Sequence, residues 1–270
     1  MFCFITSLRS AKVAEDWTHV SRLFERMAAS VFGQSASSFR LIAVCHEPPK
    51  LKQCFDERLE FITVNFPAPS YDCDQMVNDK VRKLIVALRR SRELGASFVM
   101  PIDADDLISS RLVAYALAHP DADGWFVDRG WRYEHGRRWI DVLDRFNLVC
   151  GSCNILSRRW FAFPGQPERE REAETELIEN GHHQVAQAFL ARGVKLKPIP
   201  FRAAVYVDHF GDRLGEELSR RQAVGLAIRR RPVARIAGQL KRASLTLRKR
   251  RWCDADLRQE FAIGEVLKCE

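Results

Sequence analysis

Three aspartates, Asp103, Asp105 and Asp106, follow directly on the apolar run at residues 98–102. Carboxylates one or two positions apart can hold a hard divalent cation such as Mg²⁺ or Mn²⁺, which prefers oxygen ligands and often bridges them to substrate phosphates. Asp105 or Asp106 can instead cap a following helix, but a cap does not explain all three. The pattern therefore favours a metal or phosphate site at the end of a buried strand.

The segments before these aspartates alternate between strand and helix patterns. Apolar runs predict strands, and apolar residues spaced three and four apart predict helices. Strands are expected at 2–8, 39–47, 59–66 and 98–102, and helices at 17–31 and 77–88. This alternation predicts an α/β fold, with a mostly parallel sheet flanked by helices. Ligands of such sheets bind at the carboxyl ends of the strands, where residues 6–9, 45–47 and 103–106 are expected to lie.

The second half of the chain has a more mixed pattern. We expect a helix at 111–119, a strand pair at 124–133 and 137–143, an exposed loop or short helix near the site at 164–179, a helix at 182–193, and strands at 195–200 and 203–209. We divide the chain into a body at 1–215 and a basic helical extension at 216–270.

The bulk composition is that of a folded globular protein, with 46% hydrophobic and 29% charged residues. No apolar run approaches the length of a membrane-spanning helix, and the N-terminus lacks a secretory signal pattern. We therefore expect a cytoplasmic location. The eight cysteines lack the density of a disulfide framework, and Cys150 and Cys153, in the sequence CGSC, are expected to be structural thiols rather than a redox pair or half of a zinc site.

The chain resembles the GT-A glycosyltransferases, nearest the family-2 type. Two features carry the resemblance: the helix end with Ser30, Val31, Gln34 and Ser35 before an apolar strand, and the Asp-x-Asp-Asp motif at 103–106. It covers residues 2–130 well and 145–210 loosely. It implies a GT-A, Rossmann-like fold and transfer of a sugar, hexosyltransferase-like, from a nucleotide-diphosphate donor to a saccharide or lipid-linked acceptor. It also implies that the body divides into a nucleotide-sugar half at 1–130 and an acceptor half at 131–215.

The resemblance also implies roles for individual residues. Asp105 would hold the Mn²⁺ or Mg²⁺ that bridges the donor diphosphate, Asp103 would contact the ribose or the metal, and Asp106 would assist. Residues of the nucleotide site would be Thr6, Ser7 and Arg9 at the first strand end, His46 and Glu47 beside the base, and Asp79 and Lys80 near the base or phosphates. Lys80 and Lys83 can alternatively belong to a solvated helix face. His209, paired with Asp208, would close the metal site, unless it is a strand-end histidine without a ligand.

The acceptor half departs from the family pattern. Where an acidic pair with a general base is usual, this chain has His182 and His183. A histidine can deprotonate an acceptor hydroxyl because its ordinary pKa is about 6.5. Either histidine can instead be a helix-start residue without a catalytic role, and the other candidate bases are Glu174, Glu176 and Glu179. Inversion at the sugar carbon is the expected outcome.

The net charge of +8 belongs to the C-terminal extension, because residues 216–251 hold twelve basic residues and two glutamates. Val233, Ile236, Leu240, Ala243 and Leu247 form one apolar stripe. Such a helix can lie on an anionic membrane surface, consistent with a peripheral position at its inner face. It can equally pack on its own domain. Nucleic acid is not expected as a partner, since the extension has few aromatic residues and no recognisable reading module.

Three other functions compete with glycosyl transfer. Haloacid dehalogenase-type phosphotransferases also place Asp-x-Asp after an apolar strand, but near the start of the fold and with Thr or Val where Leu107 stands. A sugar-nucleotide pyrophosphorylase would need a glycine-rich loop after the first strand, and SLRSAKVAED has no glycine. A basic adaptor for membranes or nucleic acid would need none of the carboxylates. A metal-dependent glycosyltransferase is the preferred prediction.

Overall fold

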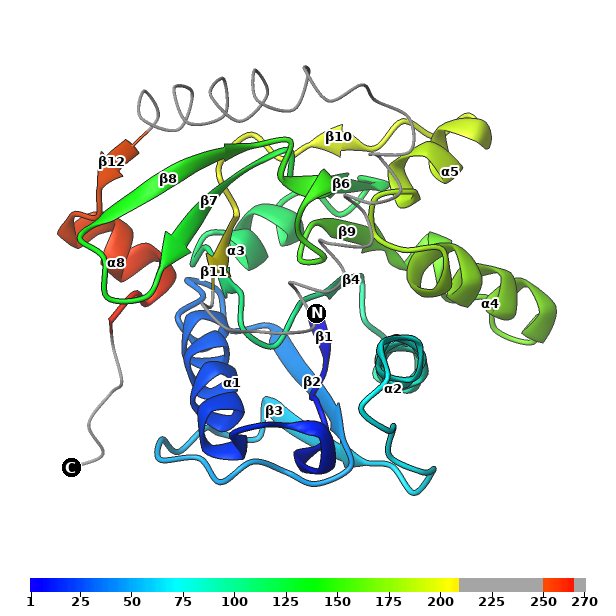
Figure 1. The fold of residues 1–270 in the computed structure, drawn as a ribbon. Helices are drawn as coiled ribbons and strands as arrows, with labels where there is room; N and C mark the ends of the chain where they lie inside the picture. The colour runs from blue at the N-terminus through cyan, green and yellow to red at the C-terminus, as the bar shows by residue number, and fades with distance from the viewer. Residues whose placement is uncertain (209–249, 265–270) are drawn as a thin grey trace, which may run out of the picture.

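The computed structural model describes residues 1–208 and 250–264, which form two β-sheets with helices around them (Figure 1). The larger sheet has the strand order β10-β6-β9-β4-β1-β2-β3, and the smaller one has the order β12-β8-β7-β11-β5. Residues 209–249 lie outside the described residues. They include most of the predicted extension and its apolar stripe. No helix among the described residues is long and apolar enough to cross a membrane.

The larger sheet is mostly parallel, as predicted. Strand β1 (Phe2–Ser7) lies at its centre, between β2 (Phe39–Cys45) and β4 (Phe98–Pro101), and β3 (Leu59–Thr63) pairs with β2. Beyond β4 follow β9 (Asn154–Ser157), β6 (Gly124–Phe126) and β10 (Lys197–Pro198). Only β9 runs against its neighbours, so the carboxyl ends of the other strands share one edge.

Alternating side chains of β1 divide the core between the two faces of this sheet. Phe2 and Phe4 pack in the cluster that contains Phe24 and Met27 of α1 (Trp17–Phe32). Cys3 and Ile5 pack in the second cluster, with Leu84, Ala87 and Leu88 of α2 (Cys73–Glu93). Aspartates begin both helices, because the side chains of Asp16 and Asp72 accept hydrogen bonds from backbone amides of the first turn. Each face of the sheet is thus covered by one long amphipathic helix.

The smaller sheet has its own apolar face. Its strands are β5 (Leu107–Ile108), β7 (Arg129–Glu134), β8 (Trp139–Asp144), β11 (Ala204–Asp208) and β12 (Arg250–Trp252). Helix α8 (Ala255–Phe261) packs on it, where Leu257 and Phe261 join a cluster with Trp131 and Tyr133. Residues 250–252 are therefore a strand, although we predicted a helical extension. This described part of the extension, residues 250–264, packs on the body.

The predicted strand at 124–133 is two strands that belong to different sheets. The amide of Val127 donates to the carbonyl of Cys153 at 2.8 Å and so still pairs with the larger sheet. The carbonyl of Asp128 then accepts from the amide of Phe146 at 2.9 Å, and β7 continues against β8. An apolar run alone does not show such a change of partner.

The remaining helices are short. They are η1 (Ala11–Val13), α3 (Leu112–Leu117), η2 (Phe146–Leu148), η3 (Arg158–Trp160), α4 (Pro167–Glu174), a π-helical turn η4 (Thr175–Glu179) and α5 (Val185–Ala191). The helix predicted from residue 182 begins only at Val185. His182 and His183 precede it in a turn that follows Gly181, whose φ is +82°.

We expect the Gly124→Ala substitution to lower the free energy of unfolding by about 3 kcal/mol. Gly124 has a φ of +137°, and a Cβ there would lie 2.2 Å from the carbonyl oxygen of Ile155. Gly136→Ala is the matched control, because its φ is +82° but a Cβ would meet nothing within 4 Å. This control substitution should lower the free energy of unfolding by only about 1 kcal/mol. Urea denaturation followed by circular dichroism measures both, and equal losses would contradict this account.

Candidate functional site

The aspartates lie in a loop that passes from the larger sheet to the smaller one. This acid loop, residues 102–106, leaves β4 and enters β5 directly. The amide of Ile102 still donates to the carbonyl of Ile5 at 2.9 Å, so the loop begins beside the end of β1. Since β1, β2 and β4 are parallel, residues 6–9, 45–47 and 103–106 share one edge of the sheet, as predicted.

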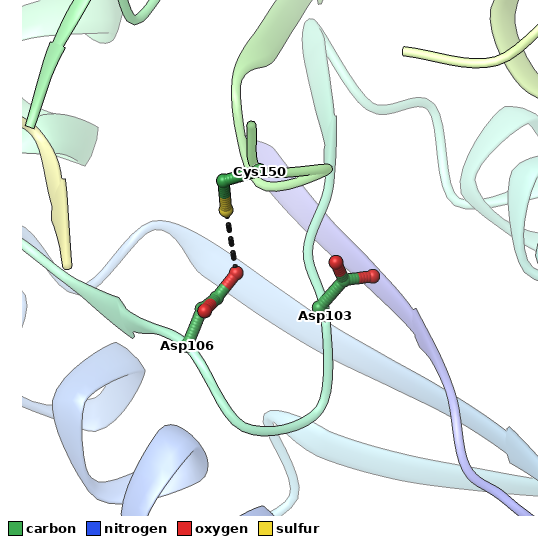
Figure 2. Close-up of side chains that lie close together, drawn as sticks. All are labelled: Asp103, Asp106 and Cys150. Atoms are coloured by element: carbon green, nitrogen blue, oxygen red, sulfur yellow. Dashed lines mark hydrogen bonds between the residues drawn. The ribbon is translucent and has the colours of Figure 1, made fainter. Parts of the chain in front are cut away.

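Asp106 points into the protein and not toward solvent. It is 1% exposed, and its Oδ2 accepts hydrogen bonds from the Cys150 thiol at 2.8 Å and from the Ser152 hydroxyl at 2.6 Å. Its Oδ1 accepts from the amide of Val207 at 3.3 Å. Figure 2 shows Asp106 directed at Cys150, with Asp103 on the other limb of the loop. Asp106 thus connects the acid loop to two distant segments of the chain.

The CGSC sequence at residues 150–153 forms the turn that holds this loop. The buried hydroxyl of Ser152 also accepts from the amide of Asp103 at 2.8 Å, so one side chain binds both ends of the acidic segment. A Cβ at Gly151 would lie 2.8 Å from Oδ2 of Asp103, which explains why a residue without a side chain stands there. Cys150 and Cys153 are buried free thiols, consistent with the structural role predicted for them.

The helix end that carries the family resemblance holds the loop from its other side. The Ser30 hydroxyl accepts from the amide of Ile108 at 3.1 Å. The Gln34 amide group donates to the carbonyl of Ser109 at 2.8 Å and accepts from the amide of Val113 at 2.9 Å. These residues fix the chain that immediately follows the aspartates. Their position in the sequence, far upstream, gave no direct indication of this contact.

Asp103 forms an ion pair with Lys80 of α2. Burial disfavours the charged form of Asp103, but the Lys80 ammonium holds the pKa of this carboxyl group below its usual value. Burial alone would lower the pKa of the Lys80 ammonium group, but the charge of Asp103 and its hydrogen bond raise it. The net effect is a raised pKa. The Lys80 side chain remains 47% exposed, so a positive charge stands at the surface of the site.

Asp106 and Cys150 are perturbed in a different way. Burial, followed by the charges of Asp105 and Asp103, raises the pKa of Asp106 well above its usual value. Burial and the nearby aspartates likewise raise the pKa of the Cys150 thiol. One donor atom from each of Asp103, Asp106 and Cys150 lies within 4.8 Å of the others, which makes them a possible metal-binding cluster. A protonated thiol is a poor ligand, because the thiolate is the form that binds metals.

A buried polar network borders the site on the β1–β2 side. Lys83, predicted as a possible solvated residue, is fully buried, and its ammonium donates to the carbonyl of Leu8 at 2.8 Å and to Asp79 at 2.6 Å. The Nε2 of His46 lies 3.7 Å from the other oxygen of Asp79. Buried atoms without a hydrogen-bond partner include Thr6 Oγ1, His46 Nδ1 and Asp79 Oδ1. These atoms offer unused hydrogen-bonding capacity at the strand ends.

Other predicted nucleotide-site residues lie at the same edge. Ser7 ends β1 and Arg9 follows it, both partly exposed. The carboxylate of Glu47 accepts hydrogen bonds from the hydroxyl of Ser10 at 3.3 Å and from the amide of Ala11. It therefore supports the short helix η1 after β1.

His182 is a predicted base whose charge interacts with that of Asp103 in the acid loop. Its backbone carbonyl accepts from the side chain of Asn154 at 2.8 Å, and its buried Nε2 has no hydrogen-bond partner. Burial lowers the pKa of His182, Lys80 adds to this effect, and the negative charge of Asp103 opposes it. His183, whose ring centroid is 5.5 Å from that of His182, is exposed.

The three glutamates considered as bases are placed differently. Glu174 is 4% exposed and pairs with Arg89 and Arg92 of α2. Glu176 pairs with Arg192, and exposed Glu179 accepts a hydrogen bond from the hydroxyl of Thr175 at 3.0 Å. The segment predicted as an exposed loop or short helix near the site is thus a helix and a π-helical turn, with Glu174 anchored to α2.

His209 lies outside the described residues. Its predicted companion Asp208 ends β11, where Arg132 of β7 donates to its carboxylate at 2.9 Å.

No family model matches the sequence, and no curated protein matches it. Among solved structures, S. aureus TarS 1–349 in complex with UDP has 11% identity and a TM-score of 0.42, over 77% of this chain and 61% of that one. TarS 1–349 in complex with UDP-GlcNAc has 12% identity and a TM-score of 0.44, over 79% and 60%. S. aureus TarS has 13% identity and a TM-score of 0.43, over 77% and 36%. This chain thus spans less than two thirds of each, and likenesses so distant carry no argument about its activity.

The Glu174→Gln substitution should cost about 3 kcal/mol of folding free energy at pH 7, because it leaves Arg89 and Arg92 without their buried partner. Burial alone would raise the pKa of Glu174, but hydrogen bonds from both arginines hold it below its ordinary value of 4.5. The stabilisation is therefore complete above pH 4.5 and disappears as the pH falls through the native value.

Wild type and Glu174→Gln should therefore differ less in their free energy of unfolding near pH 3 than at pH 7. Urea denaturation at the two pH values measures this difference. The exposed Glu172, on the same helix, supplies the control Glu172→Gln, which should match wild type at both values. A pH-independent difference for Glu174→Gln would be inconsistent with the ion pair.

Proposed function

We propose that this protein is a divalent metal-dependent glycosyltransferase, which moves a sugar from a nucleotide-diphosphate donor to a hydroxyl of a saccharide or lipid-linked acceptor. One observation carries the proposal: at a shared edge of parallel strands, the carboxylate of Asp103 meets the exposed ammonium of Lys80, near the unpartnered imidazole of His182. A cation for the phosphates, carboxylates for a metal and a base for the acceptor are the groups that glycosyl transfer requires.

Lys80 is suited to bind the donor diphosphate. It is an exposed cation of α2 that contacts the acid loop, whereas the ammonium of Lys83 is fully buried and held by Asp79 and Leu8. The half-exposed ammonium can exchange its contact with Asp103 for one with a phosphate at little cost in free energy, because both partners are negatively charged. The unpartnered polar atoms of Thr6, His46 and Asp79 support a nucleoside position at the adjacent strand ends.

We assign a hard divalent ion to Asp103 and Asp105, although the donor atoms that lie within 4.8 Å of one another are those of Asp103, Asp106 and Cys150. Both oxygens of Asp106 already accept hydrogen bonds, and a raised pKa keeps the Cys150 thiol protonated. Oxygen ligands suit Mg²⁺ or Mn²⁺ better than a thiol does. A bound ion would stabilise the negative charge that develops on the departing diphosphate. Asp106 then serves to position the loop from inside.

We assign the general base to His182. Its lowered pKa keeps the imidazole neutral near pH 7, so that Nε2 can accept a proton. The acceptor oxygen forms a bond to the anomeric carbon, the bond from that carbon to the diphosphate breaks, and the electron pair leaves with the diphosphate. The acceptor proton passes to His182. This single displacement inverts the anomeric carbon.

Isothermal titration calorimetry should detect binding of UDP or GDP that requires Mn²⁺. Asp105→Ala should weaken this binding at least about tenfold, because it removes a ligand of the ion. Asp121→Ala, an exposed aspartate before β6, serves as the control and should bind as wild type does. If neither diphosphate binds in the presence of metal, the donor site assigned to these nucleotides is wrong, and silence of other nucleoside diphosphates would favour a phosphotransferase or an adaptor.

His182→Asn should reduce turnover of the sugar nucleotide by about 10²- to 10⁴-fold, the usual contribution of a general base. Metal-dependent diphosphate binding should be unaffected, because the imidazole acts on the acceptor. His183→Asn is the matched control, since its ring is exposed and adjacent. Release of nucleoside diphosphate, measured with a coupled assay, separates the two variants, and similar rates for both would remove His182 from this role.

A further inference from the structure

A hollow of about 610 Å³ opens between residues 126–129 and residues 144–148. The first segment is the crossing from β6 to β7, and the second contains the turn from β8 into η2. Neither segment was predicted to belong to a site. The volume lies within the range typical of sites for small ligands, about 300–1,000 Å³.

The hollow lies at the same edge of the larger sheet as the aspartates. Both β4 and β6 pair antiparallel with β9, so they run parallel to one another and their carboxyl ends share that edge. Phe126 at the end of β6 is the register partner of Asn154, whose side chain holds the carbonyl of His182. Val127 pairs with Cys153 of the turn that binds Asp103 and Asp106. One wall of the hollow is therefore the direct strand neighbour of the residues that hold the proposed base.

The hollow combines balanced charge with an apolar rim. Asp128 and Asp144 line it together with Arg129 and Arg145, so the ionisable side chains cancel. Leu148 is 57% exposed at its rim. Carboxylates accept hydrogen bonds from hydroxyls, guanidinium groups donate to them, and an apolar side chain packs on the C–H face of a sugar ring. A neutral, polyhydroxylated ligand suits this lining better than an acidic or an entirely apolar one.

Asp128 offers an unused acceptor to such a ligand. Its Oδ1 is a buried atom that accepts no hydrogen bond, and its ion-pair partner, the Nε of Arg129, is 3.6 Å away. A buried carboxylate oxygen without a hydrogen bond is unfavourable, and a ligand hydroxyl would supply the missing donor. Oδ1 of Asp144, in contrast, forms an ion pair with Arg202, whose Nη2 lies 3.8 Å away.

We propose that this hollow is the acceptor subsite, that it binds a neutral oligosaccharide, and that Asp128 accepts a hydrogen bond from one of its hydroxyls. The assignment rests on the proposed function, because an acceptor subsite must lie beside the donor and the base.

A glycan array tests the assignment with the intact chain. The probes are neutral oligosaccharides built from glucose, galactose, mannose and N-acetylhexosamines, printed beside oligosaccharides that contain uronic acids. Wild type should bind at least one neutral probe, and Asp128→Ala should weaken that binding about tenfold or more, as expected for a lost hydrogen bond to a charged group. Asn147→Ala, in the opposite wall, should also weaken it. Asp121→Ala lies before β6, at the opposite edge, and should bind as wild type does.

Parallel calorimetry with UDP and GDP in the presence of Mn²⁺ separates the two proposals. If diphosphate binding is intact but no neutral probe binds, or if Asp128→Ala and Asn147→Ala bind as wild type does, the acceptor subsite is refuted while the donor site stands. Preferential binding of uronic acid probes would also overturn it, because the lining predicts a neutral ligand. If binding of UDP and GDP fails as well, the donor site assigned to these nucleotides is wrong too, and silence of other nucleoside diphosphates would overturn the glycosyltransferase proposal itself. Thermal unfolding of each variant shows whether a loss of binding reflects a loss of folding.

Discussion

The buried carboxyl group of Asp106 is the contact on which the site depends. A carboxyl group removed from water is costly unless hydrogen bonds replace its hydration, and here a thiol, a hydroxyl and a backbone amide do so. Because these donors belong to residues 150–152 and to β11, the loop is fixed only when both segments are in place. Asp103, on the other limb of the same loop, is left to meet Lys80. One interior aspartate thus determines where the other carboxylates can lie.

The two sheets are joined at the edge where this chemistry gathers. The chain crosses from the larger to the smaller sheet at residues 102–106 and again at 127–128, and both crossings stand at carboxyl ends of parallel strands. The first crossing carries the aspartates to which we assign the donor, and the second forms a wall of the hollow. Short connections between sheets leave their side chains little freedom, so the acid loop and the hollow are held at a fixed separation.

Much of the larger sheet could be predicted from the sequence, because α1 and α2 have strong helical periodicity and β1, β2 and β4 are short apolar runs between them. The aspartates were equally clear, since charge at the end of such a run is unusual. The change of sheet after Val127 was missed because an apolar run does not name its partner. The burial of Lys83 was not predicted, because a lysine on a helix is ordinarily solvated, and only the three-dimensional fold places Asp79 and the carbonyl of Leu8 around it. The contacts of Ser152 and Gln34 depend on segments far apart in the chain, which no local pattern reveals.

The pairing of β12 with β8 has a consequence for biosynthesis. Until residues 250–264 have left the ribosome, β8 is an open edge strand, and the apolar face around Trp131 and Tyr133 lacks Leu257 and Phe261. Exposed strand edges and apolar surface promote association between nascent chains. The smaller sheet therefore stays unfinished until the chain has been synthesised through residue 264.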